Sequence, residues 1–270
     1  MIPKIIHYCW FSKNPMPAEA LECIKSWKKQ LPGYTIKKWG SDSFDFNSVP
    51  FLRDAVKYKK WAFASDFIRC YALFYEGGIY LDTDVFVRKN MDFVLENRAF
   101  SAMECYPHLI EQIKMDGSVD ENGDKVSPDS VIHGIQIQAA ILGAEKGHPF
   151  FKDCLDYYLG HDFVIDENGN VPEGIISPIV FANIAVKYGF KYRNEEQSLD
   201  EGFHLYPVEM FCPQPYLMQE EAVAVHCCNG SWRRSEKSRL RSSLSFIAEY
   251  VKRFLNFINL RKERNIEKLK

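Results

Sequence analysis

The segment SDFIRCYALFYEGGIYLDTDVFV, Ser65 to Val87, is the most informative part of this chain for predicting its fold. Its pattern predicts a helix, a turn at two consecutive glycines, and an apolar strand that ends in two aspartates. Period-2 alternation along that strand places Asp82 and Asp84 on the same side. Predicted strands and helices alternate elsewhere along the chain, which is typical of βαβ units and of an α/β fold.

Two carboxylates at one strand end repel each other unless a cation lies between them. A hard divalent ion prefers oxygen ligands and leaves coordination positions open, which phosphate oxygens commonly fill. The pair Asp82 and Asp84 therefore predicts a site for a metal ion and a diphosphate.

An Asp-x-Asp pair alone is weak evidence for such a site, because 16 aspartates in 270 residues give roughly one Asp-x-Asp by chance. The residues around the pair therefore carry the evidence. Asp66 and Arg69 lie three residues apart on the preceding helix, hence on one face. Arginine is the preferred partner of phosphate groups. Two alternatives stay open at this point, namely exposed aspartates on a turn and a surface ion pair between Asp66 and Arg69.

The other helices follow from apolar periodicity and turn residues. We expect the helix over residues 17–30 to bury one face that contains Leu21, Ile24 and Trp27. The remaining predicted helices span residues 47–58, 61–76, 148–158 and 178–188.

The strands are predicted in the same way. One continuous apolar strand is expected over residues 135–142, with Gln136 and Gln138 on one face. The remaining predicted strands span residues 4–10, 34–39, 77–87, 100–104 and 222–227.

Two nearly identical segments, DENGD (Asp120 to Asp124) and DENGN (Asp166 to Asn170), interrupt this pattern. Each contains Asn-Gly, the strongest signal for a two-residue β-hairpin turn. The ligand spacing of an EF-hand calcium loop is absent. We therefore expect both segments to cap β-ribbons.

Composition indicates a globular chain that can form one large core, with 46% hydrophobic and 14% aromatic residues. No apolar run reaches the roughly 18 residues of a membrane span, and the first residues predict a strand rather than a signal peptide. The eight cysteines are scattered apart from Cys227-Cys228, which favours reduced thiols over disulfides or structural zinc. We therefore expect a cytoplasmic protein.

Charge is distributed unevenly along the chain. Residues 233–270 carry 12 Lys and Arg against 4 Asp and Glu, a balance of +8, whereas residues 1–232 carry a balance of −10. Apolar residues recur at steps of 3 and 4 over residues 242–260, which predicts a basic amphipathic helix. We expect a globular domain over residues 1–232 and a helical tail over residues 233–270.

A basic amphipathic helix with aromatic residues is typical of an interfacial membrane anchor. The alternative is a helix that packs on the domain or on a second copy of the chain. The aromatic residues of the tail lie on its apolar stripe rather than among the charges, which speaks against nucleic acid as a partner.

Five segments together resemble a family of glycosyltransferases with an Asp-x-Asp motif. That family includes capsular-polysaccharide sugar transferases and yeast α-mannosyltransferases (glycosyltransferase family 32) and, more distantly, the glucosylating clostridial toxins. The segments follow the family's order and span most of residues 1–232. They are IPKIIHYCWF (Ile2 to Phe11), KKWAFASDFIR (Lys59 to Arg69), YEGGIYLDTDV (Tyr75 to Val85), GAEKGHPF (Gly143 to Phe150) and HCCNGSW (His226 to Trp232).

The resemblance implies a GT-A-type nucleotide-diphospho-sugar transferase fold, a Rossmann-like mixed sheet flanked by helices, to which the basic amphipathic tail is added. It implies a metal-dependent, retaining transfer of a hexose from a nucleotide sugar, with a UDP-sugar favoured and Mn²⁺ or Mg²⁺ as cofactor. The acceptor would be a growing glycan or a lipid-linked oligosaccharide in capsular, exopolysaccharide or other surface polysaccharide synthesis. A peripheral position on the inner face of the cytoplasmic membrane would suit such an acceptor.

The resemblance also assigns roles around the donor sugar. Asp66 would hold sugar hydroxyls, and Arg69 would contact the sugar or a phosphate. Ser65 would bond the ribose or the sugar. Trp10 would stack on the nucleotide base, with core packing as the alternative. Tyr80 would reach a phosphate, with a packed aromatic as the alternative.

Metal and diphosphate contacts complete the implied site. Asp84 would bind the metal directly, and Asp82 would reach the ribose, the sugar or the metal. His226 would be a further metal ligand. Trp232, with Ser231 beside it, would close over the diphosphate as a lid that excludes water.

Two other classes of function remain open. A metal-dependent phosphohydrolase also uses Asp-x-Asp, but it would need an aspartyl nucleophile after the first strand, where this chain has Tyr8-Cys9-Trp10. A non-catalytic protein that binds a nucleotide sugar or a glycan would not need a complete set of metal ligands.

Overall fold

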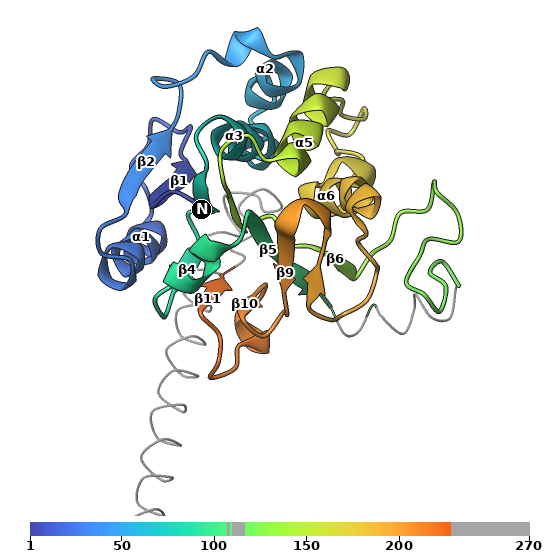
Figure 1. The fold of residues 1–270 in the computed structure, drawn as a ribbon. Coiled ribbons are helices and arrows are strands. Elements are labelled where there is room, and N and C mark those ends of the chain that lie inside the picture. Colours follow the sequence, from blue (N-terminus) through green and yellow to red (C-terminus); the bar gives the residue numbers. More distant parts are fainter. Residues whose placement is uncertain (107–108, 110–116, 228–270) are drawn as a thin grey trace, which may run out of the picture. The chain divides into compact units, whose positions relative to one another are not determined.

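The computed structural model describes residues 1–106, 109 and 117–227 (Figure 1). The chain as far as residue 227 lies within one compact unit. The predicted domain boundary after Trp232 and the predicted tail helix lie outside the described residues. No helix in the described ranges is long and apolar enough to cross a membrane.

A mixed sheet forms the centre of this unit. Its strands lie in the order β2-β1-β3-β7-β5-β9-β8, and β6 pairs with β5 off this path (Figure 1). Neighbouring strands are parallel from β2 to β3 and between β5 and β9, whereas β7 is antiparallel to both β3 and β5. The strands are β1 (Ile5–Cys9), β2 (Thr35–Trp39), β3 (Gly78–Leu81), β5 (Ala99–Cys105), β6 (Ile135–Ile137), β7 (Ile141–Ala144), β8 (Gln197–Ser198) and β9 (Phe203–Tyr206).

A second, smaller sheet has the order β10-β11-β4. It consists of β10 (Phe211–Cys212), β11 (Ala224–His226) and β4 (Val85–Val87). β4 follows β3 directly in the sequence, so the chain passes from the central sheet to the small sheet through residues 82–84.

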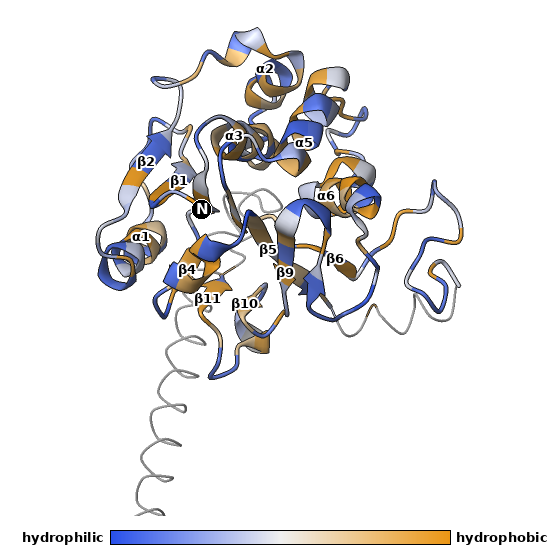
Figure 2. Ribbon diagram, in the orientation of Figure 1, coloured by the Kyte–Doolittle hydropathy of each residue, from blue (hydrophilic) through white to orange (hydrophobic). Residues whose placement is uncertain are grey.

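The helices cover the central sheet because successive strand residues point to opposite faces. Tyr80 contributes to an apolar core with α3 and α5, whereas Ile79 and Leu81 contribute to a second core with Trp27 of α1. Figure 2 shows hydrophobic residues concentrated on the strands and on the inner sides of the helices. The helices are α1 (Ala18–Gln30), α2 (Pro50–Lys57), α3 (Trp61–Tyr75), α5 (Pro149–Gly160) and α6 (Ser177–Ala185). The α/β class and the mixed sheet flanked by helices are therefore confirmed.

The predicted double-glycine turn joins α3 to β3. Gly77 and Gly78 have φ angles of 70° and 112°, which favour glycine. A Cβ atom on Gly78 would lie 2.7 Å from the carbonyl oxygen of Ile5. Glycine is therefore required where the chain turns into the sheet beside β1.

His7, on the neighbouring strand β1, also stabilises this turn. Its Nε2 bonds the carbonyl oxygen of Gly77 at 2.7 Å, and Trp39 Nε1 donates to its Nδ1 at 3.1 Å. Burial lowers the pKa of His7, so the ring stays neutral with Nε2 as the donor. His7 on β1 is therefore a structural histidine that links the turn before β3 to Trp39 on β2.

The Asp-x-Asp pair does not lie on a strand, so that prediction is wrong. β3 ends at Leu81, and the amide of Val85 donates to the carbonyl oxygen of Asp82 at 2.9 Å, which closes a turn. The aspartates approach each other because the chain bends between two sheets, and not because of strand alternation.

The predicted buried face of α1 is also wrong in part. Leu21 is 53% exposed, whereas Ala20, Cys23 and Trp27 are buried. Trp27 Nε1 donates to the carbonyl oxygen of Val85 at 2.7 Å. This bond to β4 sets the rotation of the helix and turns Leu21 toward solvent.

Two predicted elements are interrupted. The helix over residues 47–58 is divided at Val49, which is extended and precedes Pro50, since a residue before proline disfavours the helical region. The strand over residues 135–142 is divided into β6 and β7. Ser101 Oγ bonds the carbonyl oxygens of Gln138 and Ile141 across this gap, at 2.7 and 3.1 Å.

The two Asn-Gly segments form turns without the predicted ribbons. Asp120 Oδ1 accepts the amides of Asn122 and Asp124, and Asp166 Oδ1 accepts those of Asn168 and Asn170. Only the glycine of each Asn-Gly pair has a positive φ, whereas the two-residue hairpin turn needs both residues there. The aspartate side chains therefore cap these turns, and in the described part of the chain only one isolated bridge, Val119 to Lys125, flanks them.

Candidate active site at the Asp-x-Asp turn

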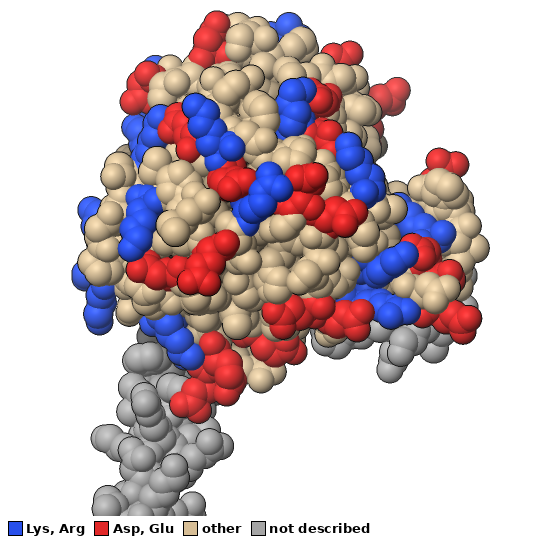
Figure 3. Space-filling view, in the orientation of Figure 1, with Lys and Arg blue, Asp and Glu red and all other residues tan. Residues whose placement is uncertain are grey.

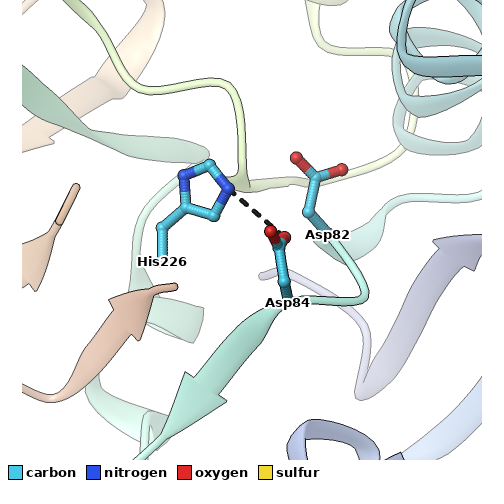
Figure 4. Close-up of side chains that lie close together, drawn as sticks. All are labelled: Asp82, Asp84 and His226. Atoms are coloured by element: carbon cyan, nitrogen blue, oxygen red, sulfur yellow. Dashed lines mark ion pairs between the residues drawn. The ribbon is translucent and has the colours of Figure 1, made fainter. Parts of the chain in front are cut away.

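Asp82, Asp84 and His226 form one cluster. Each offers one potential ligand atom, and these atoms all lie within 4.8 Å of one another. His226 Nε2 lies 3.3 Å from Asp84 Oδ1. Figure 4 shows the imidazole directed at the Asp84 carboxylate, with Asp82 at the start of the same turn. The arrangement fits a metal that accepts carboxylate oxygen and imidazole nitrogen.

Backbone pairing between β4 and β11 brings His226 to the aspartates. The two strands are antiparallel, with His226 opposite Val85. The amide of Cys227 donates to the carbonyl oxygen of Asp84 at 2.8 Å. Arg88, just after β4, adds bonds from Nη1 to the carbonyl oxygens of Gln219 and Ala222, both at 2.9 Å. The segment that leads into β11 is thus fixed to the strand that leaves the Asp-x-Asp turn.

Asp82 is held by protein groups on one oxygen. Its Oδ1 accepts the Tyr80 hydroxyl at 2.8 Å and lies 3.3 Å from Arg69 Nη2. Burial raises the pKa of Tyr80, so the phenol stays protonated and remains a donor. The Tyr80 ring is buried and stacks under the Arg69 guanidinium at 4.8 Å. The structure thus shows Tyr80 as a packed aromatic whose hydroxyl orients Asp82.

Asp66 and Arg69 form a buried ion pair, so the alternative of a surface pair is wrong. Arg69 Nη2 lies 3.0 Å from Asp66 Oδ1, and the side chains are 4% and 6% exposed. Arg69 Nη1 also donates to the carbonyl oxygen of Ala139 at 2.5 Å. The guanidinium therefore bridges the carboxylates of Asp66 and Asp82 and ties both to the end of the β6–β7 connection.

Burial and neighbouring charges shift the pKa values of both partners in the Asp66–Arg69 ion pair. Burial raises the pKa of Asp66 to about 6, against the opposing effects of Arg69 and the Ser177 hydroxyl. Burial disfavours the charged form of Arg69. The negative charge of Asp82 and the other neighbouring groups outweigh the effect of burial and raise the pKa of Arg69 well above its usual value. Arg69 stays cationic, and Asp66 is a buried carboxyl group whose pKa is raised above its usual range.

Ser65 and Trp10 complete the described part of the predicted site. Ser65 Oγ donates to the carbonyl oxygen of Ala62 at 2.6 Å and accepts Arg69 Nη2 at 2.9 Å. Trp10 follows β1 and is half-buried, and its Nε1 donates to the carbonyl oxygen of Asn14 at 3.1 Å. Because β1 and β3 are parallel, Trp10 and Asp82 lie at the same carboxyl edge, where open α/β sheets bind nucleotides.

The two glutamines of the predicted strand over residues 135–142 bond the backbone. Gln136 and Gln138 are buried, and their amide groups donate to the carbonyl oxygens of Ile132 and Phe211. Ser231 and Trp232 lie outside the described residues. Sequence reasoning missed Ser177, whose hydroxyl donates to Asp66 Oδ1 at 2.9 Å. The only local signal at Ser177 was a serine before a helix-starting proline, and it does not reveal a partner on another helix.

Comparison with known proteins agrees with this geometry. The family described as "Glycosyltransferase sugar-binding region containing DXD motif" matches residues 17–101, a segment that contains Asp66, Arg69, Asp82 and Asp84. An uncharacterized glycosyltransferase, L373, of Acanthamoeba polyphaga mimivirus is 24% identical over 241 residues, which cover 86% of this chain and 84% of that protein.

A second relative is inositol phosphoceramide mannosyltransferase 3 of Schizosaccharomyces pombe. It is 26% identical over 153 residues, which are 55% of this chain but only 35% of that protein. Among solved structures, the PaToxG glycosyltransferase has a TM-score of 0.45 at 17% identity, with 69% of each chain covered. Mouse xyloside xylosyltransferase 1 has a TM-score of 0.45 at 11% identity, with 83% of this chain and 97% of that chain covered.

The family match and both relatives point to the same class of enzyme. The chain resembles glycosyltransferases that carry a DXD motif, and the predicted enzyme class, a glycosyltransferase, is confirmed.

Proposed function

We propose that this protein transfers a hexose from a nucleoside-diphosphate sugar to a glycan hydroxyl in a metal-dependent reaction. The observation that carries the proposal is the convergence of Asp82, Asp84 and His226, whose potential ligand atoms lie within 4.8 Å of one another. Two carboxylates and an imidazole suit Mn²⁺, and Mg²⁺ is the alternative. A bound ion would neutralise the charge that develops on the leaving diphosphate.

The donor sugar would lie beside Asp66, on the other side of Arg69 from the Asp-x-Asp turn. A carboxylate is a strong acceptor for sugar hydroxyls, and Arg69 is held between Asp66 and Asp82. Trp10 would stack on the nucleotide base at the carboxyl edge of β1. We favour a UDP-sugar, because the resemblance associates a tryptophan at this position with the base.

The transfer is proposed to retain the anomeric configuration. The bond between the sugar C1 and the diphosphate oxygen breaks, and a bond from C1 to the acceptor oxygen forms on the same face. The acceptor's proton passes to the leaving phosphate. Trp232 and Ser231 would close over the diphosphate and exclude water, which limits hydrolysis of the donor.

The acceptor is proposed to be a growing glycan or a lipid-linked oligosaccharide of a surface polysaccharide such as a capsule. The +8 balance of residues 233–270 supports this, since a basic amphipathic helix binds anionic membrane surfaces. The face in Figure 3 intersperses basic and acidic side chains over the described residues. The tail would be the cationic partner of an anionic surface, with the protein peripheral on the inner face of the cytoplasmic membrane.

Calorimetric titration of the purified protein with UDP and with GDP, each with and without Mn²⁺, tests the proposal. We expect Mn²⁺-dependent binding of UDP. Manganese-dependent binding of GDP instead would still support a glycosyltransferase, but with a GDP-sugar as the donor. A hydrolysis screen of sugars linked to whichever nucleotide binds would then identify the donor sugar.

Binding of neither nucleotide would overturn the proposal. Release of phosphate from monoesters would then favour a metal-dependent phosphohydrolase. Binding of a nucleotide sugar without turnover in the presence of acceptors would favour a non-catalytic binding protein.

A further inference from the structure

Ser177 reaches Asp66 from another helix. It is the first residue of α6, its side chain is buried, and its hydroxyl donates to Asp66 Oδ1 at 2.9 Å. Asp66 lies on α3, so this bond joins two helices above the central sheet. No position near Asp66 in the sequence supplies an equivalent donor in the described part of the chain.

The hydroxyl does not serve its own helix. α6 begins after Ile176, which provides no side-chain cap, and Pro178 follows Ser177 in the first turn. Serine at a helix start ordinarily bonds a free backbone amide of the first turn. Here the hydroxyl bonds a buried carboxylate instead, so a capping role does not explain Ser177.

The Ser177 hydrogen bond and the Arg69 ion pair involve the same oxygen of Asp66. Arg69 Nη2 lies 3.0 Å from Asp66 Oδ1, and Ser177 Oγ lies 2.9 Å from it. In the described residues, Oδ2 takes no hydrogen bond from the protein. The terminal torsion of aspartate is broad, so a single contact leaves the carboxylate free to turn. The Ser177 hydrogen bond and the Arg69 ion pair together restrict that torsion, and Oδ2 is the oxygen left for a ligand.

We infer that Ser177 is a positioning residue that holds Asp66 with Oδ2 presented to the hydroxyls of the donor sugar. The inference rests on the proposed function. It adds that residues around the start of α6 influence how the sugar is bound. Ser177 acts through Asp66, and its contribution concerns the sugar rather than the nucleotide or the metal.

The test compares the affinities of UDP and of UDP-glucose or UDP-galactose, measured by calorimetry with Mn²⁺. Ser177→Ala should weaken binding of the UDP-sugar about tenfold, as expected for a lost bond to a charged group. Binding of UDP alone should stay within about twofold, because UDP carries no sugar. Ser177→Thr keeps the hydroxyl and should restore sugar affinity. If the protein binds GDP rather than UDP, the same comparison is made with GDP and GDP-mannose.

Two further variants separate positioning from packing. In an Asp66→Ala background, Ser177→Ala should add nothing to the loss of sugar affinity, because coupled residues are not additive. Ser26→Ala is the matched control, since Ser26 is equally buried and its hydroxyl bonds only backbone groups. It should leave the ratio of UDP-sugar to UDP affinity unchanged.

Failure of the role of Ser177 and failure of the proposed function would give different results. Equal losses of UDP and UDP-sugar affinity in Ser177→Ala, or additive losses in the double variant, would overturn the role of Ser177 and leave the proposed function standing. A wild-type protein that binds neither nucleotide would overturn both.

Discussion

His226 Nε2 lies 3.3 Å from Asp84 Oδ1, although the two residues are far apart in the sequence. The contact exists because β11 pairs antiparallel with β4 directly after the Asp-x-Asp turn. The small sheet, rather than the central one, therefore assembles the cluster of potential metal ligands.

Replacement of Asp84 tests this cluster. Asp84→Ala should abolish Mn²⁺-dependent binding of UDP, and His226→Ala should weaken it about tenfold or more, since metal sites depend on each ligand. Asp156→Ala is the control, because Asp156 lies exposed on α5 in an ion pair with Lys152 and such pairs contribute little. Unchanged Mn²⁺ dependence of UDP affinity in Asp84→Ala would rule out this metal site.

The buried carboxylate of Asp66 predicts a pH dependence of stability. Burial raises its pKa to about 6, whereas an aspartate in an unfolded chain titrates near about 3.9. Between these values the folded protein keeps a proton that the unfolded chain has lost. The contribution of Asp66 to the free energy of unfolding is thus full below about pH 4 and declines as pH rises through about 6.

Asp66→Asn removes this ionisation. Relative to wild type, its free energy of unfolding in urea, without metal, should rise by roughly 1 to 3 kcal/mol between pH 4 and 6.5. Asp156→Asn should show no such change. If the difference between Asp66→Asn and wild type is the same at both pH values, the pKa of Asp66 is not raised.

The turn before β3 predicts a large difference between two glycine substitutions. In Gly78→Ala the new Cβ would lie 2.7 Å from the backbone oxygen of Ile5, at a φ of 112°. In Gly147→Ala the φ is 80°, and no atom lies within 4 Å of the new Cβ. Gly147→Ala should cost about 1 kcal/mol from backbone strain alone, and Gly78→Ala about 2 kcal/mol more from the clash. Thermal unfolding of both variants measures this, and equal losses would contradict the close approach.

The tail predicts membrane association. A variant that lacks residues 242–270 should no longer sediment with vesicles that contain anionic lipid, whereas the full chain should bind them less tightly as salt increases. UDP affinity should be unchanged by the deletion. Vesicle binding that survives the deletion would show that the anchor lies elsewhere.

The sequence predicted the elements whose periodicity is strong. The apolar strands around Ile6, Ile79 and Phe100 lie where expected, and the double glycine marks the turn. Predictions failed where a distant contact decides the local conformation. Trp27 rotates α1 through its bond to Val85, and Ser101 fills the break between β6 and β7. Neither contact can be predicted from the local spacing of apolar residues.

The sequence alone predicts the α/β class, the Asp-x-Asp pair and the Asp66–Arg69 helix face, because these depend on residues close together in the chain. The folded structure is needed to show that the aspartates lie on a turn between two sheets, that His226 contacts Asp84, and that Ser177 bonds Asp66. These relationships depend on strand pairing and helix packing between distant segments. Their geometry is fixed by backbone hydrogen bonds and burial across the whole fold, which local spacing does not encode.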